Sequence, residues 1–148
     1  MRATLDFLLH DWLRVESLTA RARFADHSRE TFAAVLDTCE RIAREKFAPA
    51  NRTADLEEPR FDGEKVILPA STHAASRAYV ESGMLAAAQD AALGGMQLPC
   101  VVEMAANSFF AKAGVGLGGH MLTSGNANLL MAHGTPTQQR VFAHQEFA

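Results

Sequence analysis

The sequence predicts an all-α domain, and three observations support that prediction. Apolar residues recur at helical spacing in most segments, turn residues separate these segments, and strand-like signals are confined to one short stretch. The chain has 148 residues, of which 48% are hydrophobic, and this suits one domain, residues 1–148, with its own core. We therefore expect an orthogonal or up-and-down bundle of about five to six helices.

The first two helices are predicted from apolar stripes and capping residues. The first has Thr4 placed to cap it, and its stripe consists of Leu5, Leu8, Leu9, Trp12 and Leu13. Ser28 can cap the second helix, in which the apolar stripe consists of Phe32, Val35, Leu36, Cys39, Ile42 and Ala43. Pro49 is expected to end or kink this helix because proline lacks the N–H that an inner helical position needs.

A small hairpin and two further helices are expected in the middle of the chain. Asp62-Gly63, between Arg60-Phe61 and Val66-Ile67, favours a two-stranded hairpin. Ser71 or Thr72 can cap a third helix with Ala75, Ala78, Tyr79 and Ser82 on its stripe, and Gly83 is its stop. Pro99 fits the first position of a fourth helix, which continues to about Gly114.

The last two helices meet at a strong start signal. The fifth is expected over residues 117–133 and ends at Gly134. Thr135 is a good N-cap, Pro136 suits the first helical position, and Gln138 can complete a capping box. The sixth helix then runs through Val141 and Phe142 without a stop signal, which predicts that the sequence is a fragment of a longer protein.

Composition excludes several classes of function. The net charge is −3 with 21% charged residues, which does not indicate a nucleic-acid-binding surface. No run reaches the ~18 apolar residues of a membrane-spanning helix. The N-terminus lacks the uninterrupted apolar stretch of a signal peptide, so we expect a soluble, cytoplasmic protein. Cys39 and Cys100 are isolated thiols and do not suggest a disulfide framework.

Short motifs give no catalytic constellation. Gly114, Gly116 and Gly119 satisfy G-x-G-x-x-G, but a helix precedes them where a dinucleotide site needs a strand. They fit a loop between helices, and glycines that open a helix can leave room for a ligand chain. The histidines form no metal-ligand pattern. Glu103 can be a buried acid, although a solvent-facing or capping role is the more common one, and Thr123 and Ser124 are outside any G-x-S-x-G motif.

Two motifs in sequence order resemble acyl-CoA dehydrogenases. DAALGGMQLP, residues 90–99, resembles the P-E-x-aromatic-G-G-x-G-L turn between the third and fourth helices of that family's N-terminal α domain. LMAHGTPTQQ, residues 130–139, resembles the family's G-T-x-x-Q-K helix start. The paired glycines, Gly94 and Gly95, would permit a tight turn that side chains resist. Gln97 stands where the family motif has glycine.

The N-terminal third also resembles one subgroup of the family. FLLHDWL and FADHSRETFAAVLDTCERIAREKFAPANR look like the long-chain subgroup that includes 3-methylmercaptopropionyl-CoA dehydrogenases, which has an extra leading helix. The resemblance therefore covers nearly the whole chain and implies the N-terminal domain of the acyl-CoA dehydrogenase fold.

The resemblance implies that the full-length protein oxidises an acyl-CoA at Cα–Cβ with FAD as hydride acceptor. The flavin-binding β-domain and the C-terminal helical domain with the catalytic glutamate would lie outside residues 1–148, which would be inactive alone. Electron-transferring flavoprotein and a homo-oligomeric partner are implied as well. In the family this domain forms one wall of the acyl pocket, and the matching substrate-binding positions are Leu117, Gly118 and Met121. The alternative for these three is simple packing against the fourth helix.

Two other interpretations of the chain stay open at this stage. A stand-alone helical module that works by protein–protein contact would need no downstream domains. A non-catalytic homologue would have lost the catalytic glutamate of the full-length protein.

Overall fold

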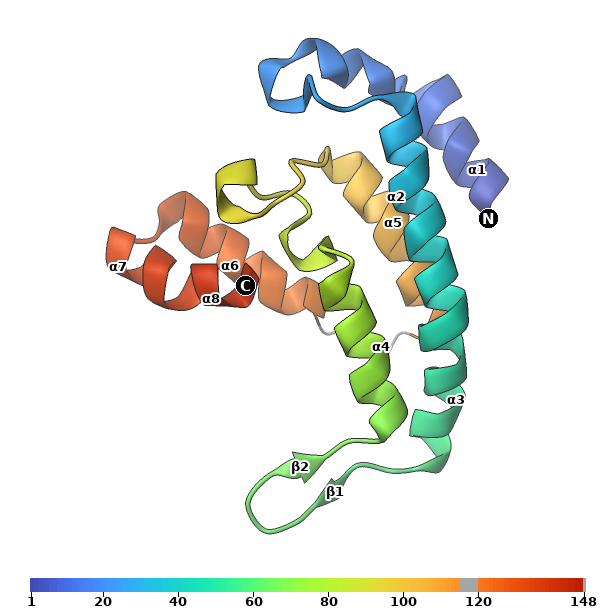
Figure 1. Cartoon of the computed structure of the whole chain (residues 1–148), viewed down its shortest axis with the longest axis vertical. Helices are drawn as coiled ribbons and strands as arrows, with labels where there is room; N and C mark the ends of the chain where they lie inside the picture. The colour runs from blue at the N-terminus through green and yellow to red at the C-terminus, as the bar shows by residue number, and fades with distance from the viewer. Residues whose placement is uncertain (115–119, 148) are drawn as a thin grey trace.

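The molecule is built around a long helical rod with further helices beside and across it (Figure 1). The computed structural model describes residues 1–114 and 120–147, without the side chains of residues 120–122 and 146. The rod consists of α2 (Arg29–Ile42), the π-helical segment η4 (Ala43–Phe47) and α3 (Ala48–Leu56). α4 (Ala70–Glu81) lies beside it, and α5 (Cys100–Ala113) packs mainly against α2. Predominantly helical structure confirms the predicted all-α class.

Ser28 caps the start of the rod, as predicted, and Thr31 completes a capping box there. The backbone N–H of Thr31 donates to Ser28 Oγ at 3.3 Å, and the N–H of Ser28 donates to Thr31 Oγ1 at 2.8 Å. Pro49, however, does not end the helix, which continues to Leu56. The wider turn of η4 directly precedes Pro49, and it makes room for the ring that would otherwise meet the carbonyl four residues earlier.

The N-terminal segment forms a helix, but its predicted cap is wrong. α1 (Arg2–Asp6) and the π-helical η1 (Phe7–Trp12) are continuous, and Met1 is the N-cap without a side-chain hydrogen bond. Thr4 lies inside the helix because the Met1 carbonyl already accepts the N–H of Leu5. Only part of the expected stripe faces the core, since Leu9 is buried and Trp12 is 70% exposed. Two 3₁₀ segments, η2 (Val15–Ala20) and η3 (Ala22–Phe24), then lead to α2.

The predicted hairpin is confirmed at the lower end of the molecule in Figure 1. β1 (Arg60–Phe61) and β2 (Val66–Ile67) are antiparallel, with Arg60 opposite Ile67 and Phe61 opposite Val66. The Asp62 carboxylate accepts the backbone N–H groups of Glu64 and Lys65 at 3.0 and 2.9 Å. This side chain therefore holds the turn that its residue opens.

α4 begins earlier than its predicted caps. Pro69 is the N-cap, and its carbonyl accepts the N–H of Thr72, so Ser71 and Thr72 are both helical. Their hydroxyl oxygens are buried without a hydrogen-bond partner, so the capping prediction for these two residues is wrong. Gly83 ends the helix as expected, with φ at 79°.

α5 provides the centre of the core. Pro99 is its N-cap, one position before the predicted one, and Gly114 is its C-cap. Phe110 of α5 packs its ring 4.8 Å from the Phe47 ring and 5.0 Å from the Tyr79 ring. The rod, α4 and α5 therefore share one aromatic cluster, which stabilises their mutual packing.

The turn before α5 explains the paired glycines. It contains η5 (Met84–Ala86) and η6 (Ala91–Leu93). Gly94 has φ at 78°, in the left-handed region. A Cβ on Gly95 would collide with the Gln89 carbonyl and lie 2.7 Å from the Ala86 carbonyl oxygen. Both glycines are thus required, one by its backbone angle and the other by close approach.

The last elements form a C-terminal arm, residues 120–147, that crosses the direction of α4 (Figure 1). It comprises α6 (His120–His133), α7 (Pro136–Gln138), the π-helical η8 (Gln139–Ala143) and α8 (His144–Phe147). The Thr135–Gln138 capping box and Pro136 at the helix start are confirmed. The end of α6 at Gly134 is also confirmed, and a Cβ there would lie 2.5 Å from the Leu130 carbonyl oxygen. The predicted helical residues 117–119 lie outside the described residues.

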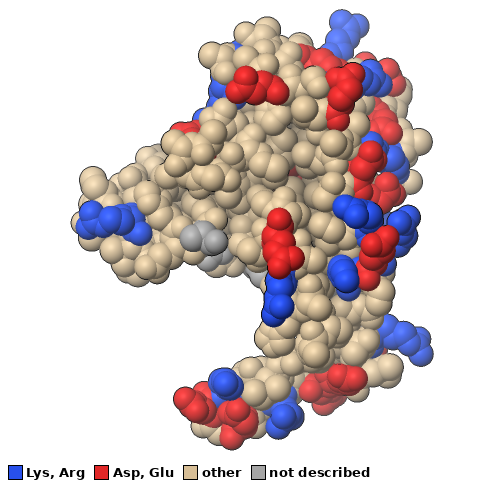
Figure 2. Space-filling model, in the orientation of Figure 1, with Lys and Arg blue, Asp and Glu red and all other residues tan. Residues whose placement is uncertain are grey.

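Charge is unevenly distributed between the body and the arm. In Figure 2, acidic and basic side chains gather over the rod, the N-terminal segment and the hairpin, whereas the arm shows few. Between Lys112 and Arg140 the sequence contains no Asp, Glu, Lys or Arg. Within the described residues, no helix is long and apolar enough to cross a membrane.

Replacing Gly95 by alanine is expected to destabilise the fold. The added Cβ would force the backbone away from the Gln89 and Ala86 carbonyls, at a cost of about 1–3 kcal/mol in the free energy of unfolding. Urea denaturation monitored by circular dichroism measures this. Gly125→Ala in α6 is the matched control, because open space surrounds that position and alanine favours a helix by roughly 0.5–1 kcal/mol over glycine. Equal stability of the wild-type and Gly95→Ala proteins would contradict the close approach.

Candidate functional site

The predicted substrate-binding residues follow the end of α5 in the sequence. Leu117 and Gly118 lie outside the described residues, so their placement stays a prediction. Met121 lies in the first turn of α6, and its side chain is outside the description. The assignment of these three residues to a pocket wall stays a prediction.

One groove on the arm has an uncharged lining. A groove of about 330 Å³ lies between α6 and the following helical segments. It is lined by Thr123, Asn126, Ala127, Leu130, Phe142 and Gln145. Phe142 is 62% exposed. This face can accept an apolar surface or chain without desolvating a fixed charge.

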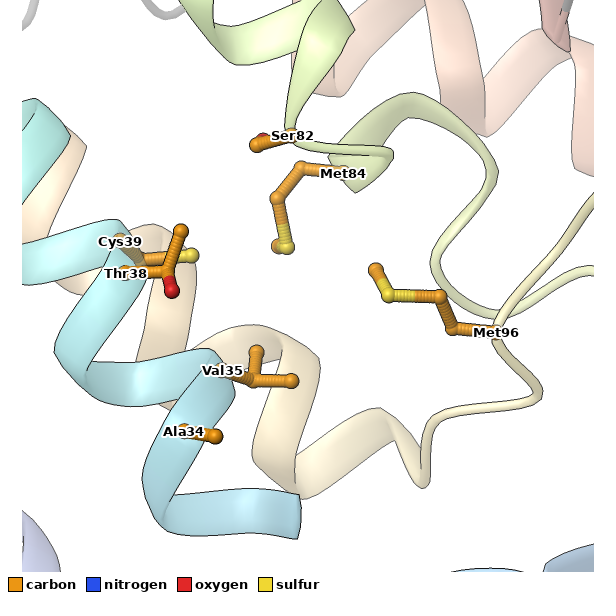
Figure 3. A pocket seen from close by; sticks show the side chains of 7 residues that line it. All are labelled: Ala34, Val35, Thr38, Cys39, Ser82, Met84 and Met96. Atoms are coloured by element: carbon orange, nitrogen blue, oxygen red, sulfur yellow. The ribbon is translucent and has the colours of Figure 1, made fainter.

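A second cavity lies between α2 and the segment that follows α4 (Figure 3). Its volume is about 210 Å³, and its lining is largely apolar. The sulfur atoms of Cys39, Met84 and Met96 point into this space from different segments. Burial raises the pKa of the Cys39 thiol to about 12, so the thiol stays protonated and is a poor nucleophile. The cavity suits a small apolar group rather than thiol chemistry.

One buried polar pair joins α4 to α5. The Tyr79 hydroxyl donates to Asn107 Oδ1 at 3.0 Å, and both residues are buried. Burial, together with the Glu103 carboxylate, raises the pKa of Tyr79 to about 12. Glu103 lies in the first turn of α5, where a negative charge is favourable, yet it is half-buried and burial raises its pKa. The hydrogen bond between Tyr79 and Asn107 thus satisfies two polar groups inside the core.

The turn before α5 is held by side chains that the sequence interpretation missed. The Arg23 guanidinium donates to the Ala88 carbonyl at 2.8 Å and pairs with the Asp90 carboxylate. His27 Nε2 lies 2.9 Å from the Met96 carbonyl oxygen and 3.2 Å from that of Gln97. Since both partners are acceptors, the proton of this imidazole is assigned to Nε2.

Gln97 contributes most to this network. Its backbone has φ at 51°, which is uncommon for a residue other than glycine. Its side-chain amide donates to the Arg23 carbonyl at 2.9 Å, and its amide oxygen accepts the Ala91 N–H at 3.3 Å. The departure from glycine in the family motif was the one available signal for this residue, whereas Arg23 and His27 had none.

The metal and nucleotide motifs considered from the sequence find no support as sites. Among the side chains that the structure describes, no group of three His, Cys, Asp or Glu could hold a metal ion. Gly114 follows the helix α5 and not a strand, so the G-x-G-x-x-G spacing lacks the strand that precedes a dinucleotide loop. Gly116 and Gly119 lie outside the described residues.

Comparison with known proteins places the chain in a family. Residues 29–145 match the family described as "Acyl-CoA dehydrogenase, N-terminal domain". The chain is also 28% identical over 135 residues to a 3-methylmercaptopropionyl-CoA dehydrogenase from Ruegeria pomeroyi. That match covers 90% of this chain and 22% of the relative, so the chain spans about a fifth of the relative's length. The family match extends over most of the chain and agrees with its all-α fold, and the chain therefore belongs to the acyl-CoA dehydrogenase family as an N-terminal domain.

Proposed function

We propose that this chain is the N-terminal α domain of an FAD-dependent acyl-CoA dehydrogenase that oxidises an acyl-CoA thioester between Cα and Cβ. The observation that supports the proposal best is the family match over residues 29–145. The confirmed glycine turn before α5 and the capping box after α6 agree with it. The β-domain and the C-terminal helical domain of such an enzyme would lie outside residues 1–148, in keeping with the length of the relative.

In this proposal the domain contributes one wall of the acyl pocket. Leu117, Gly118 and Met121 line that wall, by their match to the family's positions before the G-T-x-x-Q start. The absence of charged residues between Lys112 and Arg140 supports this role, because an acyl chain loses affinity beside a charge that must be desolvated. Glycine at 118 would leave volume for the chain.

We propose that this domain does not form the FAD site by itself. The described cavities, of about 210, 330 and 340 Å³, lie at or below the small end of the roughly 300–1,000 Å³ typical for ligand pockets. By family resemblance, the segment that binds FAD, the hydride acceptor of the proposed reaction, belongs to the β-domain. We therefore assign the main flavin contacts and the glutamate that removes the α-proton to the other domains.

The partners and location follow from the same family assignment. The proposed substrate is an acyl-CoA, and the proposed electron acceptor from the reduced flavin is an electron-transferring flavoprotein. The exposed apolar side chains Phe142 and Leu129 on the arm are suited to cover by another domain or by a second subunit of a homo-oligomer. We propose a cytoplasmic enzyme.

The 148-residue chain purified alone is expected to carry no flavin and to oxidise no acyl-CoA. The reason is that the main flavin contacts and the glutamate that removes the α-proton are assigned to the other domains of the proposed enzyme. Visible absorbance of the purified chain, and dye reduction with an acyl-CoA, measure the two properties, with the full-length protein as control. A yellow, flavin-loaded preparation of the isolated chain would overturn this assignment.

Gly118→Leu in the full-length protein is expected to lower kcat/KM for long acyl-CoAs more than for short ones. Each methylene that the new side chain excludes from an apolar pocket costs on the order of 1 kcal/mol, so the loss grows with chain length. Steady-state kinetics over a series of acyl-CoA lengths, together with a melting curve, measures this.

Gly125→Leu is the matched control for Gly118→Leu, because it adds the same side chain to a nearby glycine that faces open space. It should leave the chain-length profile unchanged. A uniform activity loss in Gly118→Leu that tracks the loss of folded protein would show a packing role and refute the pocket assignment.

A further inference from the structure

Three side chains tie the segment before α2 to the turn before α5. They are Arg23, His27 and Gln97, which we name the latch. Their partners are mainly backbone carbonyls: Arg23 donates to Ala88, and Gln97 donates to Arg23. His27 Nε2 faces the carbonyls of Met96 and Gln97. Because backbone groups receive these hydrogen bonds, the latch fixes the path of the turn rather than the position of another side chain.

Gln97 holds a conformation that its residue type resists. Glycine would adopt φ at 51° without steric cost, whereas the Cβ of glutamine crowds the following carbonyl oxygen at this angle. The amide of Gln97 spans two segments, from the Arg23 carbonyl to the Ala91 N–H. The His27 ring is itself held by stacking on Phe32, with ring centroids 5.3 Å apart. The unfavourable backbone angle is therefore offset by contacts that glycine cannot make.

The turn before α5 also contacts the arm. The Gln89 side-chain amide donates to Asn128 Oδ1 of α6. The Gln89 carbonyl accepts the backbone N–H of Gln97 at 3.0 Å, so Gln89 is held directly by a latch residue. The main contacts of the arm with the body are between η5 and the helices α6 and α8. η5 lies in the same turn. The latch thus lies at one end of a continuous set of contacts that ends on α6.

We infer that Arg23, His27 and Gln97 are positioning residues for the acyl pocket, acting through the Gln89–Asn128 hydrogen bond on α6. This inference rests on the proposed function, because α6 carries Met121 of the proposed pocket wall. Releasing the latch lets the turn move, and α6 then loses one of its contacts with the body. A displacement of a binding wall by about 1 Å is enough to lower catalytic efficiency by up to 100-fold.

The physical part of the inference is tested by amide hydrogen exchange on the full-length protein. Gln97→Gly removes the side-chain contacts. It also removes the steric cost of the backbone angle, which glycine adopts freely, so the fold is retained. His27→Phe keeps an aromatic ring on Phe32 but removes the donor. Both variants should raise exchange rates of α6 amides by about 10-fold through easier local opening. Faster exchange confined to the segment 21–27 and the turn 88–97 would overturn the coupling to α6.

The functional part is tested by a double-mutant cycle in the same protein. Gln97→Gly and Asn128→Ala should each lower kcat/KM for long acyl-CoAs by about 10-fold, with smaller losses for short ones. Their combination should lose little more than either alone, because both remove one line of contacts. His133→Ala, at an exposed position on the same helix that lines no groove described above, is the control and should match wild type. Additive losses, or losses that follow the melting temperature, would overturn the positioning role.

Failure of this inference can be distinguished from failure of the proposed function. If Gly118→Leu changes the chain-length profile and the latch variants do not, the pocket assignment stands and the latch has no positioning role. If the full-length protein oxidises no acyl-CoA, the proposed function fails, and the hydrogen-exchange result still decides whether the latch holds α6.

Discussion

The close approach of Gly95 to the carbonyls of Gln89 and Ala86 is the constraint on which the arrangement of the helices depends. It folds the turn tightly enough for the Leu98 N–H to reach the Ala87 carbonyl at 2.8 Å, immediately before Pro99 starts α5. The direction in which α5 leaves the turn is thereby set by backbone geometry. A side chain at residue 95 would open this turn and change that direction.

Once α5 has its direction, its apolar face decides the packing of the body. Phe110 meets Phe47 of the rod and Tyr79 of α4, so three elements contribute to one cluster. The buried Tyr79–Asn107 hydrogen bond lies within the same interface and removes the cost of two desolvated polar groups. The arm does not share this aromatic cluster. Its main contacts with the body are to η5, which lies in the turn before α5, so this turn determines the position of the arm.

Much of this fold was predictable because the deciding signals are local. Ser28 and Thr135 cap helices as expected, since a capping box needs only residues three positions apart. Ser71 and Thr72 were wrongly chosen as caps because Pro69, which cannot be recognised as an N-cap by its side chain, starts the helix first. The continuation past Pro49 depends on a π-helical turn, which no simple periodicity indicates.

The candidate site was less predictable, for a physical reason. Asn107 lies in an apolar helical run, and its burial follows from the distant Tyr79 hydroxyl. Gln97 is held by Arg23, which lies far away in the sequence, so its role depends on tertiary contacts. Leu117, Gly118 and Met121 were assigned by resemblance alone, and the structure does not test them.

A crystal structure of the full-length protein with a bound acyl-CoA tests most directly whether this domain supplies a wall of the acyl pocket next to α6. We expect the acyl carbons to lie in van der Waals contact with Gly118 and Met121, with the Gln89–Asn128 hydrogen bond intact. An acyl chain bound away from the α5–α6 junction, with no contact to these residues, would contradict it.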